Sequence, residues 1–96
     1  MSKEQIQAAL VAVLKQVQEL SGRAWNALKP TDKPIGSLAG FDSLCSIEAT
    51  VMVEQKLGVA LGANSVFVSD DGKRALSIEE ITQRVHGLLR ETKGNS

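Results

Sequence analysis

Apolar residues recur at spacings of three and four in three separate segments of this 96-residue chain. One segment ends at Leu20, the second spans residues 43–57, and the third starts near Ile78. Side chains at these spacings share one face of an α-helix, so each segment predicts an amphipathic helix. We expect a single all-α domain of residues 1–96. It should be a four-helix bundle with three long helices, one short helix, a long first loop and a polar tail at about 91–96.

Capping signals mark the starts of the first and last of these helices. Ser2 with Gln5, and Ser77 with Glu80, follow the capping-box pattern, in which two side chains satisfy each other's backbone N–H groups. Gly58 is expected to end the middle helix, because glycine tolerates the left-handed conformation found there. The expected inward-facing stripes are Ile6, Leu10, Val13, Val17 and Leu20 in the first helix and Ile78, Ile81, Val85, Leu88 and Leu89 in the last.

The long first loop follows Leu20 and contains prolines and glycines, which disfavour a regular helix. We expect one turn of helix around residues 25–28. Trp25 either fills the core or contacts a partner, and the core role is favoured. Turn-forming residues precede residues 65–67, which we expect to be a short helix or irregular. Propensity also allows a β-strand at residues 66–68, but so short a strand has no evident partner in the sequence.

Composition excludes several classes of protein. Lysine plus arginine and aspartate plus glutamate both number 11, so no net charge drives the chain to nucleic acid or to an anionic membrane. The single cysteine, Cys45, cannot form an internal disulfide, and neither it nor His86 has neighbours at metal-ligand spacing. The longest apolar run, residues 8–14, is far shorter than the roughly 20 residues of a membrane span. Without a signal-peptide pattern, we expect a cytoplasmic protein that holds no metal.

Asp42 and Ser43 stand where the middle helix is expected to begin. A short polar side chain at this point can cap the helix, and on this dipeptide alone an ordinary cap is the favoured interpretation. The N-terminus of a helix also carries unpaired N–H groups and the positive end of the dipole, which attract a negative group. A phosphate attached to Ser43, or bound near it, is the competing interpretation.

The middle helix has two apolar strips, although a simple surface helix needs only one. An arc of roughly 120° on the helical wheel predicts the core face, which consists of Ile47, Thr50, Val53 and Leu57. Leu44 and Val51 lie on the second strip together with Glu48 and Gln55. A mixture of apolar and charged side chains is typical of a surface that docks a protein.

The sequence Gly40-Phe41-Asp42-Ser43-Leu44, followed by an amphipathic helix ending in Leu57-Gly58-Val59, resembles the attachment segment of the acyl carrier protein family. The resemblance covers roughly residues 3–90 in the order of the helices, and only residues 40–44 match as a motif. It implies that Ser43 carries a 4′-phosphopantetheine arm through a phosphodiester. It also implies that the long loop delivers Ser43 to its helix, with Leu38 and Phe41 as apolar anchors.

The same resemblance implies how such a protein works. A phosphopantetheinyl transferase would supply the arm from coenzyme A, and the arm's thiol would hold an acyl group as a thioester. The chain would be a substrate and not an enzyme. As a monomer it would serve acyl-loading and acyl-processing enzymes of fatty-acid biosynthesis, or of specialised lipid or polyketide biosynthesis. The expected docking residues are Asp42, Leu44, Glu48, Val51, Met52 and Glu54.

The charge of this segment only partly fits the family. Residues 40–70 contain four acidic residues and one lysine, a net charge of −3. However, Cys45 and Lys56 stand where acidic residues are common in the family, which favours a dedicated set of partner enzymes. Two other classes stay open. One is an unmodified helical adaptor in which Ser43 is only a helix cap, and the other is a small nucleic-acid-binding bundle, which the balanced charge disfavours.

Overall fold

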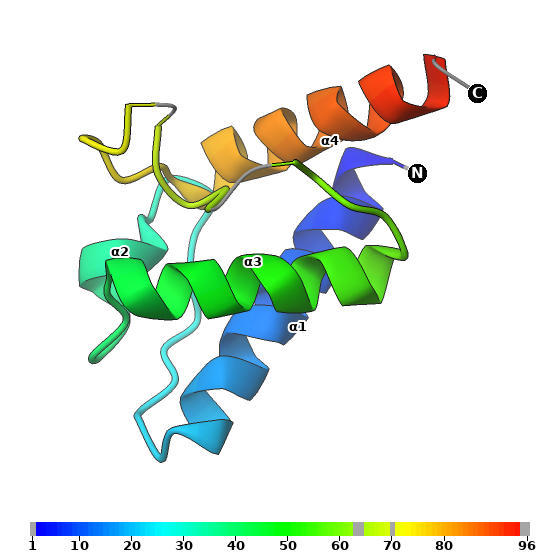
Figure 1. Cartoon of the computed structure of the whole chain (residues 1–96). Helices are drawn as coiled ribbons and strands as arrows, with labels where there is room; N and C mark the ends of the chain where they lie inside the picture. The colour runs from blue at the N-terminus through cyan, green and yellow to red at the C-terminus, as the bar shows by residue number, and fades with distance from the viewer. Residues whose placement is uncertain (1, 63–64, 70, 95–96) are drawn as a thin grey trace.

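The computed structural model describes residues 2–62, 65–69 and 71–94 (Figure 1). The helices in this part of the chain are α1 (Lys3–Leu20), α2 (Pro34–Ser37), α3 (Ser43–Leu57) and α4 (Ile78–Gly94). Three are long and one is short, so the expected all-α bundle is confirmed. The one β-type pairing among the described residues is an isolated antiparallel bridge between Val68 and Ala75.

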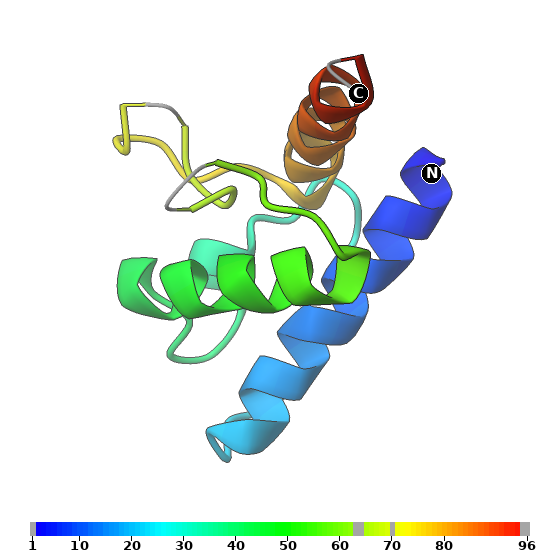
Figure 2. The same cartoon turned by 45° about the vertical axis from the view of Figure 1, so that its right-hand side comes forward.

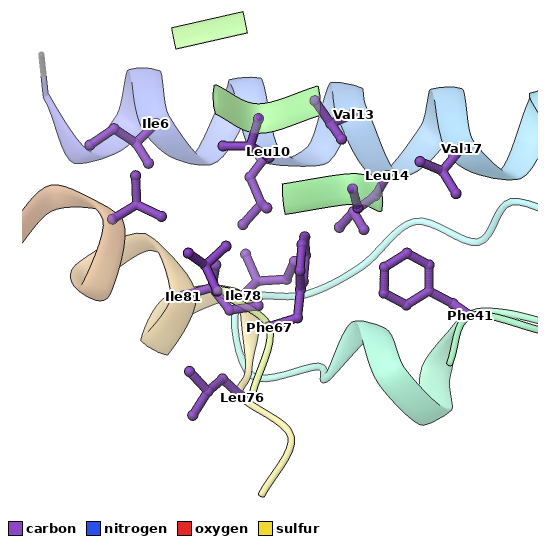
Figure 3. Packing of buried hydrophobic residues seen from close by; sticks show 14 of the residues in the cluster. Ile6, Leu10, Val13, Leu14, Val17, Phe41, Phe67, Leu76, Ile78 and Ile81 are labelled. Atoms are coloured by element: carbon purple, nitrogen blue, oxygen red, sulfur yellow. The ribbon is translucent and has the colours of Figure 1, made fainter. Parts of the chain in front are cut away.

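Helix α1 is the element on which the others pack. It contacts both α3 and α4, and the two views show α3 crossing it while α4 lies beside its N-terminal half (Figures 1 and 2). The core lies between these helices (Figure 3), where Phe67 from the loop before α4 points toward Leu10 and Leu14 of α1. Phe67 also meets Phe41 edge to face, with ring centroids 5.5 Å apart. Each long connection therefore contributes an aromatic ring to the core.

Both expected capping boxes are confirmed. In α1 the Ser2 side chain accepts from Gln5 N–H while the Gln5 side chain accepts from Ser2 N–H. Ser77 and Glu80 exchange the same two bonds at the start of α4, at 2.9 and 3.2 Å. Helix α4 continues to Gly94, through most of the segment that was expected to be a polar tail.

The inward stripes of α1 and α4 are also confirmed, with one exception. Residues 6, 10, 13 and 17 of α1 and residues 78, 81 and 85 of α4 are buried, and Leu88 and Leu89 are half-buried. Leu20 is 76% exposed, so its assignment to the core face was wrong. It is the last residue of α1.

The long first loop is held down by one buried side chain of α1. Gln18 is completely buried, and its amide nitrogen donates to the carbonyl oxygens of Ala24 and Ala39, each at 2.9 Å. This joins the beginning of the loop to its end. Leu38 and Phe41, the expected anchors, are both buried, and Trp25 is half-buried against the core. The loop therefore reaches α3 in a defined position.

The short helix is not where the sequence predicted it. Residues 25–28 contain no helix, and the single short turn, α2, lies at Pro34–Ser37. Proline at the first helical position favours that start, because its φ angle is already helical and its missing N–H is not needed there.

Residues 65–69 are likewise not helical, and they pair as a hairpin with the segment before α4. Leu76 N–H donates to the Phe67 carbonyl at 2.9 Å, and Ser69 N–H donates to the Arg74 carbonyl at 2.8 Å. Residues 74–76 thus supply the partner that the sequence did not reveal. The pairing is only a few residues long, so it leaves no alternating apolar pattern to detect.

The core face of α3 was predicted partly wrongly. Thr50 and Val53 are buried as expected and Leu57 is half-buried, but Ile47 is 43% exposed. Ser46 and Ala49 are completely buried in its place. A polar residue can take a core position when its hydroxyl has a partner, and Ser46 donates to the Ser43 carbonyl at 2.6 Å. An apolar pattern does not detect such positions.

Two valines of α3 test this assignment of faces. Val53 is 1% exposed and Val51 is 46% exposed. Val53→Asp should lower the free energy of unfolding by about 3 kcal/mol or more, because it buries an unpaired charge. Val51→Asp should cost less than about 1 kcal/mol, because water still reaches its side chain. Chemical denaturation measures both, and equal losses would contradict the orientation of α3.

Candidate functional site

Asp42, and not Ser43, caps helix α3. The Asp42 carboxylate accepts a hydrogen bond from Cys45 N–H at 3.0 Å, and Ser43 is the first residue inside the helix. Ser43 is exposed, and its hydroxyl makes no hydrogen bond within the described part of the chain. Its expected place at a helix N-terminus is confirmed, whereas the interpretation of Ser43 as the cap is wrong. The hydroxyl is left available for chemistry.

The cap places a negative charge next to Ser43. The hydrogen bond from Cys45 N–H lowers the pKa of Asp42 below its usual range, so the carboxylate is ionised at neutral pH. The nearby Arg23 guanidinium lowers the pKa of Asp42 slightly further. Together the carboxylate and the positive end of α3 form a local dipole around the serine.

Arg23 is a component of this site that sequence reasoning missed. Its guanidinium donates to the Gly40 carbonyl at 2.6 Å and to the Cys45 sulfur at 3.3 Å. Gly40 has a φ of +66°, and a Cβ there would lie 2.6 Å from Arg23 Nε, so a side chain at this position would clash. The arginine thus fixes the turn that presents Ser43. It lies far from Ser43 in the sequence and belongs to no motif.

A cleft of about 510 Å³ opens beside the serine, which we call the Ser43 cleft. Helix α3 lines it with Ser43, Ser46 and Ile47. The rest of the described lining comes from the hairpin before α4 and from α4 itself, and its members are Gly62, Ser65, Val68, Ser69, Asp71, Gly72 and Arg84. Figures 1 and 2 show this hairpin region between the N-terminal half of α3 and the start of α4.

A stripe of polar side chains on α3 holds the segment that forms the far wall of the cleft. We call it the polar stripe, and its members, spaced four residues apart, are Ser46, Thr50 and Glu54. The Ser46 and Ser65 hydroxyls lie 2.9 Å apart, and Thr50 accepts from Val66 N–H at 3.1 Å. Glu54 accepts from Leu61 N–H at 2.7 Å. Glu54, a predicted docking residue, therefore has a structural task.

The remaining predicted docking residues differ in how far they are exposed to solvent. Leu44 is 75% exposed, Val51 is 46% exposed, and Glu48 is exposed beside them. Met52 is half-buried and packs against the core. Ile47, which the sequence assigned to the core, joins this surface. We call Leu44, Ile47 and Val51 the apolar strip of α3.

Other sequence features carry no chemistry that the structure supports. Among the described residues, no three His, Cys, Asp or Glu side chains gather as metal ligands, and no helix is long and apolar enough to cross a membrane. Cys45 is a half-buried free thiol. His86 is half-buried on α4 and does not line the Ser43 cleft.

Comparisons of the chain with protein-family models, with curated proteins and with solved structures find no match. The resemblance to acyl carrier proteins accordingly stays a prediction. It rests on residues 40–44 and on the order of the helices.

Two variants test whether Asp42, and not Ser43, stabilises the start of α3. Asp42→Ala should lower the melting temperature at pH 7, because Cys45 N–H loses its partner. Ser43→Ala should melt close to the wild type. The pKa of Asp42 is lowered in the folded state, so its stabilisation is present above the unfolded pKa of about 3.9 and is lost as the pH falls through the folded value.

The melting difference between wild type and Asp42→Ala should therefore shrink in acid. Thermal melts followed by circular dichroism from pH 7 downward measure it. A Ser43→Ala variant that loses as much stability as Asp42→Ala would mean that the serine, and not the aspartate, holds the helix start.

Proposed function

We propose that this protein is an acyl carrier protein, with 4′-phosphopantetheine attached to Ser43. The observation that carries the proposal is the free, exposed Ser43 hydroxyl at the first position of α3, beside a residue that already caps the helix. A serine in this position is spare as far as the fold is concerned. The motif at residues 40–44 adds the chemical identity of the group that it would carry.

The helix end at Ser43 stabilises a phosphodiester, while the negative charge of the neighbouring Asp42 carboxylate opposes it. The first N–H groups of a helix and its dipole stabilise a negative group at this end. Attachment requires that the Ser43 oxygen bond to the β-phosphorus of coenzyme A while the pyrophosphate P–O bond breaks. Adenosine 3′,5′-bisphosphate leaves with the bridging oxygen and its electron pair, and a base must take the serine proton. No described side chain hydrogen-bonds to the hydroxyl, and Asp42 is engaged by Cys45 N–H. The proposal therefore assigns that base to a separate phosphopantetheinyl transferase.

The surface around Ser43 suits repeated docking by enzymes. Leu44, Ile47 and Val51 are exposed on α3, and Glu48 lies among them. Exposed apolar residues bordered by charge are typical of protein interfaces. In the proposed function this strip receives the transferase and the acyl-loading and acyl-processing enzymes of fatty-acid or specialised lipid or polyketide biosynthesis. The chain would act in the cytoplasm as a monomeric substrate of these enzymes.

A second candidate is an adaptor that docks a partner through the same apolar strip and is never modified. The exposure of Leu44, Ile47 and Val51 favours it as well. The form of this alternative in which Ser43 is the helix cap is excluded, because Asp42 holds that position. The two candidates differ in one covalent group, so a mass measurement separates them.

The first test is loading. After incubation with coenzyme A and a phosphopantetheinyl transferase, the wild-type mass should rise by one phosphopantetheine group, and Ser43→Ala should stay unchanged. Ser37→Ala is the matched control, because Ser37 is also an exposed serine near a short polar loop. Intact-mass spectrometry reads all three. A wild type that stays unmodified while a known carrier is fully loaded would overturn the carrier and leave the adaptor.

The second test concerns docking. Leu44→Ala should slow loading roughly fivefold, which corresponds to about 1 kcal/mol of lost binding to the transferase. Leu20→Ala is the control, because Leu20 is exposed to the same extent, 76% against 75%, but lies on α1. Initial loading rates at low protein concentration measure the effect. Equal losses in both variants, or none in Leu44→Ala, would contradict the assignment of docking to α3.

A further inference from the structure

Helix α1 carries apolar residues on the face that points away from the core. An open groove of about 510 Å³ runs along this face, and every described residue that lines it belongs to α1. We call this surface the outer face of α1, and its members are Glu4, Gln7, Ala8, Val11, Ala12 and Lys15. The outward face of a surface helix is normally polar. Here an apolar centre lies between a carboxylate at one end and an ammonium group at the other.

No described element of the chain covers the outer face. Its centre lies roughly 130° around the helix from the buried stripe of α1. Ala8 and Ala12 are exposed, and Val11 is half-buried. Figure 2 shows α1 at one edge of the molecule, with α3 and α4 packed on its other side. The outer face is therefore accessible to another molecule.

The order of residues along the outer face is self-complementary. Glu4 and Lys15 lie equally far from the midpoint between residues 9 and 10, and so do Ala8 and Val11. A two-fold axis at this midpoint would pack two copies of α1 antiparallel. Glu4 of one copy would then lie at the height of Lys15 of the other, and the same pair would form again at the opposite end. The apolar residues would meet at the centre.

The charges favour this orientation over a parallel one. A parallel pair in the same register would place Glu4 against Glu4 and Lys15 against Lys15, and like charges repel. Neither side chain has an ion pair or a hydrogen bond with any residue that the structure describes. Both charges are therefore available to a partner, and complementary charges fix the register of an interface more than they strengthen it.

The centre of the outer face allows close packing. Ala8 and Ala12 have the smallest side chains that a helix commonly carries, and the distance between two packed helices depends on the side chains at their contact. We propose that the outer face of α1 binds a second copy of this chain, antiparallel, in a weak and reversible dimer. The partner is a second copy because the charge and the apolar pattern of this face complement themselves.

The size of the contact sets its strength. The stretch from Glu4 to Lys15 is about 17 Å of helix. One helix face of this length is small beside the roughly 800 Å² that each partner buries in a stable interface. The dimer should therefore form at protein concentrations on the order of 1 mM and dissociate at micromolar concentrations.

This inference does not rest on the proposed function, and the two are compatible. The outer face includes no residue of α3, so the dimer contact uses neither Ser43 nor the apolar strip. At the low concentrations of a loading experiment the chain is the monomer that a transferase would meet. Failure to load at Ser43 would overturn the carrier and leave the dimer, and the reverse also holds.

The first test is dilution of the ¹⁵N-labelled full chain from about 1 mM to about 20 μM, concentrations chosen to bracket the expected dissociation. Backbone N–H signals of Ala8, Val11 and Lys15 should move with dilution, and the rotational correlation time should fall to that of a single chain. Signals of the apolar strip of α3 should stay in place. Shifts confined to α3 would overturn the proposal. A chain that is monomeric over the whole range would also overturn it and leave the outer face to a different partner.

Two charge reversals test the antiparallel register. Glu4→Lys leaves two cations on the outer face and Lys15→Glu leaves two anions, so each variant alone should lose its self-association. Mixed in equal amounts, the two variants should associate at least as strongly as the wild type, because both opposite-charge contacts form again between the copies. Lys29→Glu is the matched control for Lys15→Glu, since it changes the net charge equally at an exposed residue of the first loop.

The Lys29→Glu control should dimerise as the wild type does, and added salt should weaken the mixed pair. A mixture that stays monomeric where the wild type dimerises would overturn the antiparallel arrangement. Equal losses in Lys29→Glu and Lys15→Glu would mean that net charge controls association, which would overturn the assignment to the outer face. The wild-type dilution needs no variant, so it decides the proposal even where a charge reversal disturbs the fold.

Discussion

The polar stripe of α3 is the constraint on which the second half of the fold depends. The chain between α3 and α4 has no regular helix among its described residues, so its backbone groups need other partners when they approach the core. Glu54 and Thr50 provide them for the Leu61 and Val66 N–H groups, and Ser46, the third member of the stripe, bonds the Ser65 hydroxyl. Because Val66 and Phe67 follow directly, this stripe also seats the residues that fill the core beside α1.

The first loop is secured by the same means, by Gln18 of α1 and by Arg23 near the start of the loop itself. Buried Gln18 bonds the two ends of the loop, and Arg23 bonds the turn at Gly40. The Gln18 side-chain oxygen is buried without a partner, a cost of about 1–3 kcal/mol that the fold tolerates for the two bonds of the amide nitrogen. Both long connections are thus held by polar side chains reaching from helices, and Ser43 and the wall of its cleft lie where the two connections meet α3.

The features that could be predicted from the sequence are those made by residues close together in the chain, because only such interactions leave a local pattern. Capping boxes involve residues three apart, and buried stripes repeat every three or four residues, so α1, α3 and α4 could be placed from the sequence. Ile47 was assigned to the core face and Ser46 was left out of it, because an apolar count assumes that core positions are apolar. The pairing of residues 67–69 with residues 74–76 and the link from Arg23 to Gly40 were missed, because long-range contacts of one or two bonds have no periodicity.

Asp42 and Ser43 have different roles at the start of α3. In an ordinary helix start one polar residue caps, and a second serine beside it is dispensable to the fold. Here Asp42 caps, the Ser43 carbonyl accepts from Ser46, and the Ser43 hydroxyl has no hydrogen bond to any residue that the structure describes. Two groups of side chains order the structure around this hydroxyl. Arg23 bonds the Gly40 carbonyl and so holds the turn before α3, and the polar stripe holds the segment that lines the Ser43 cleft. In the proposed function, this exposed hydroxyl is the point at which the arm is attached.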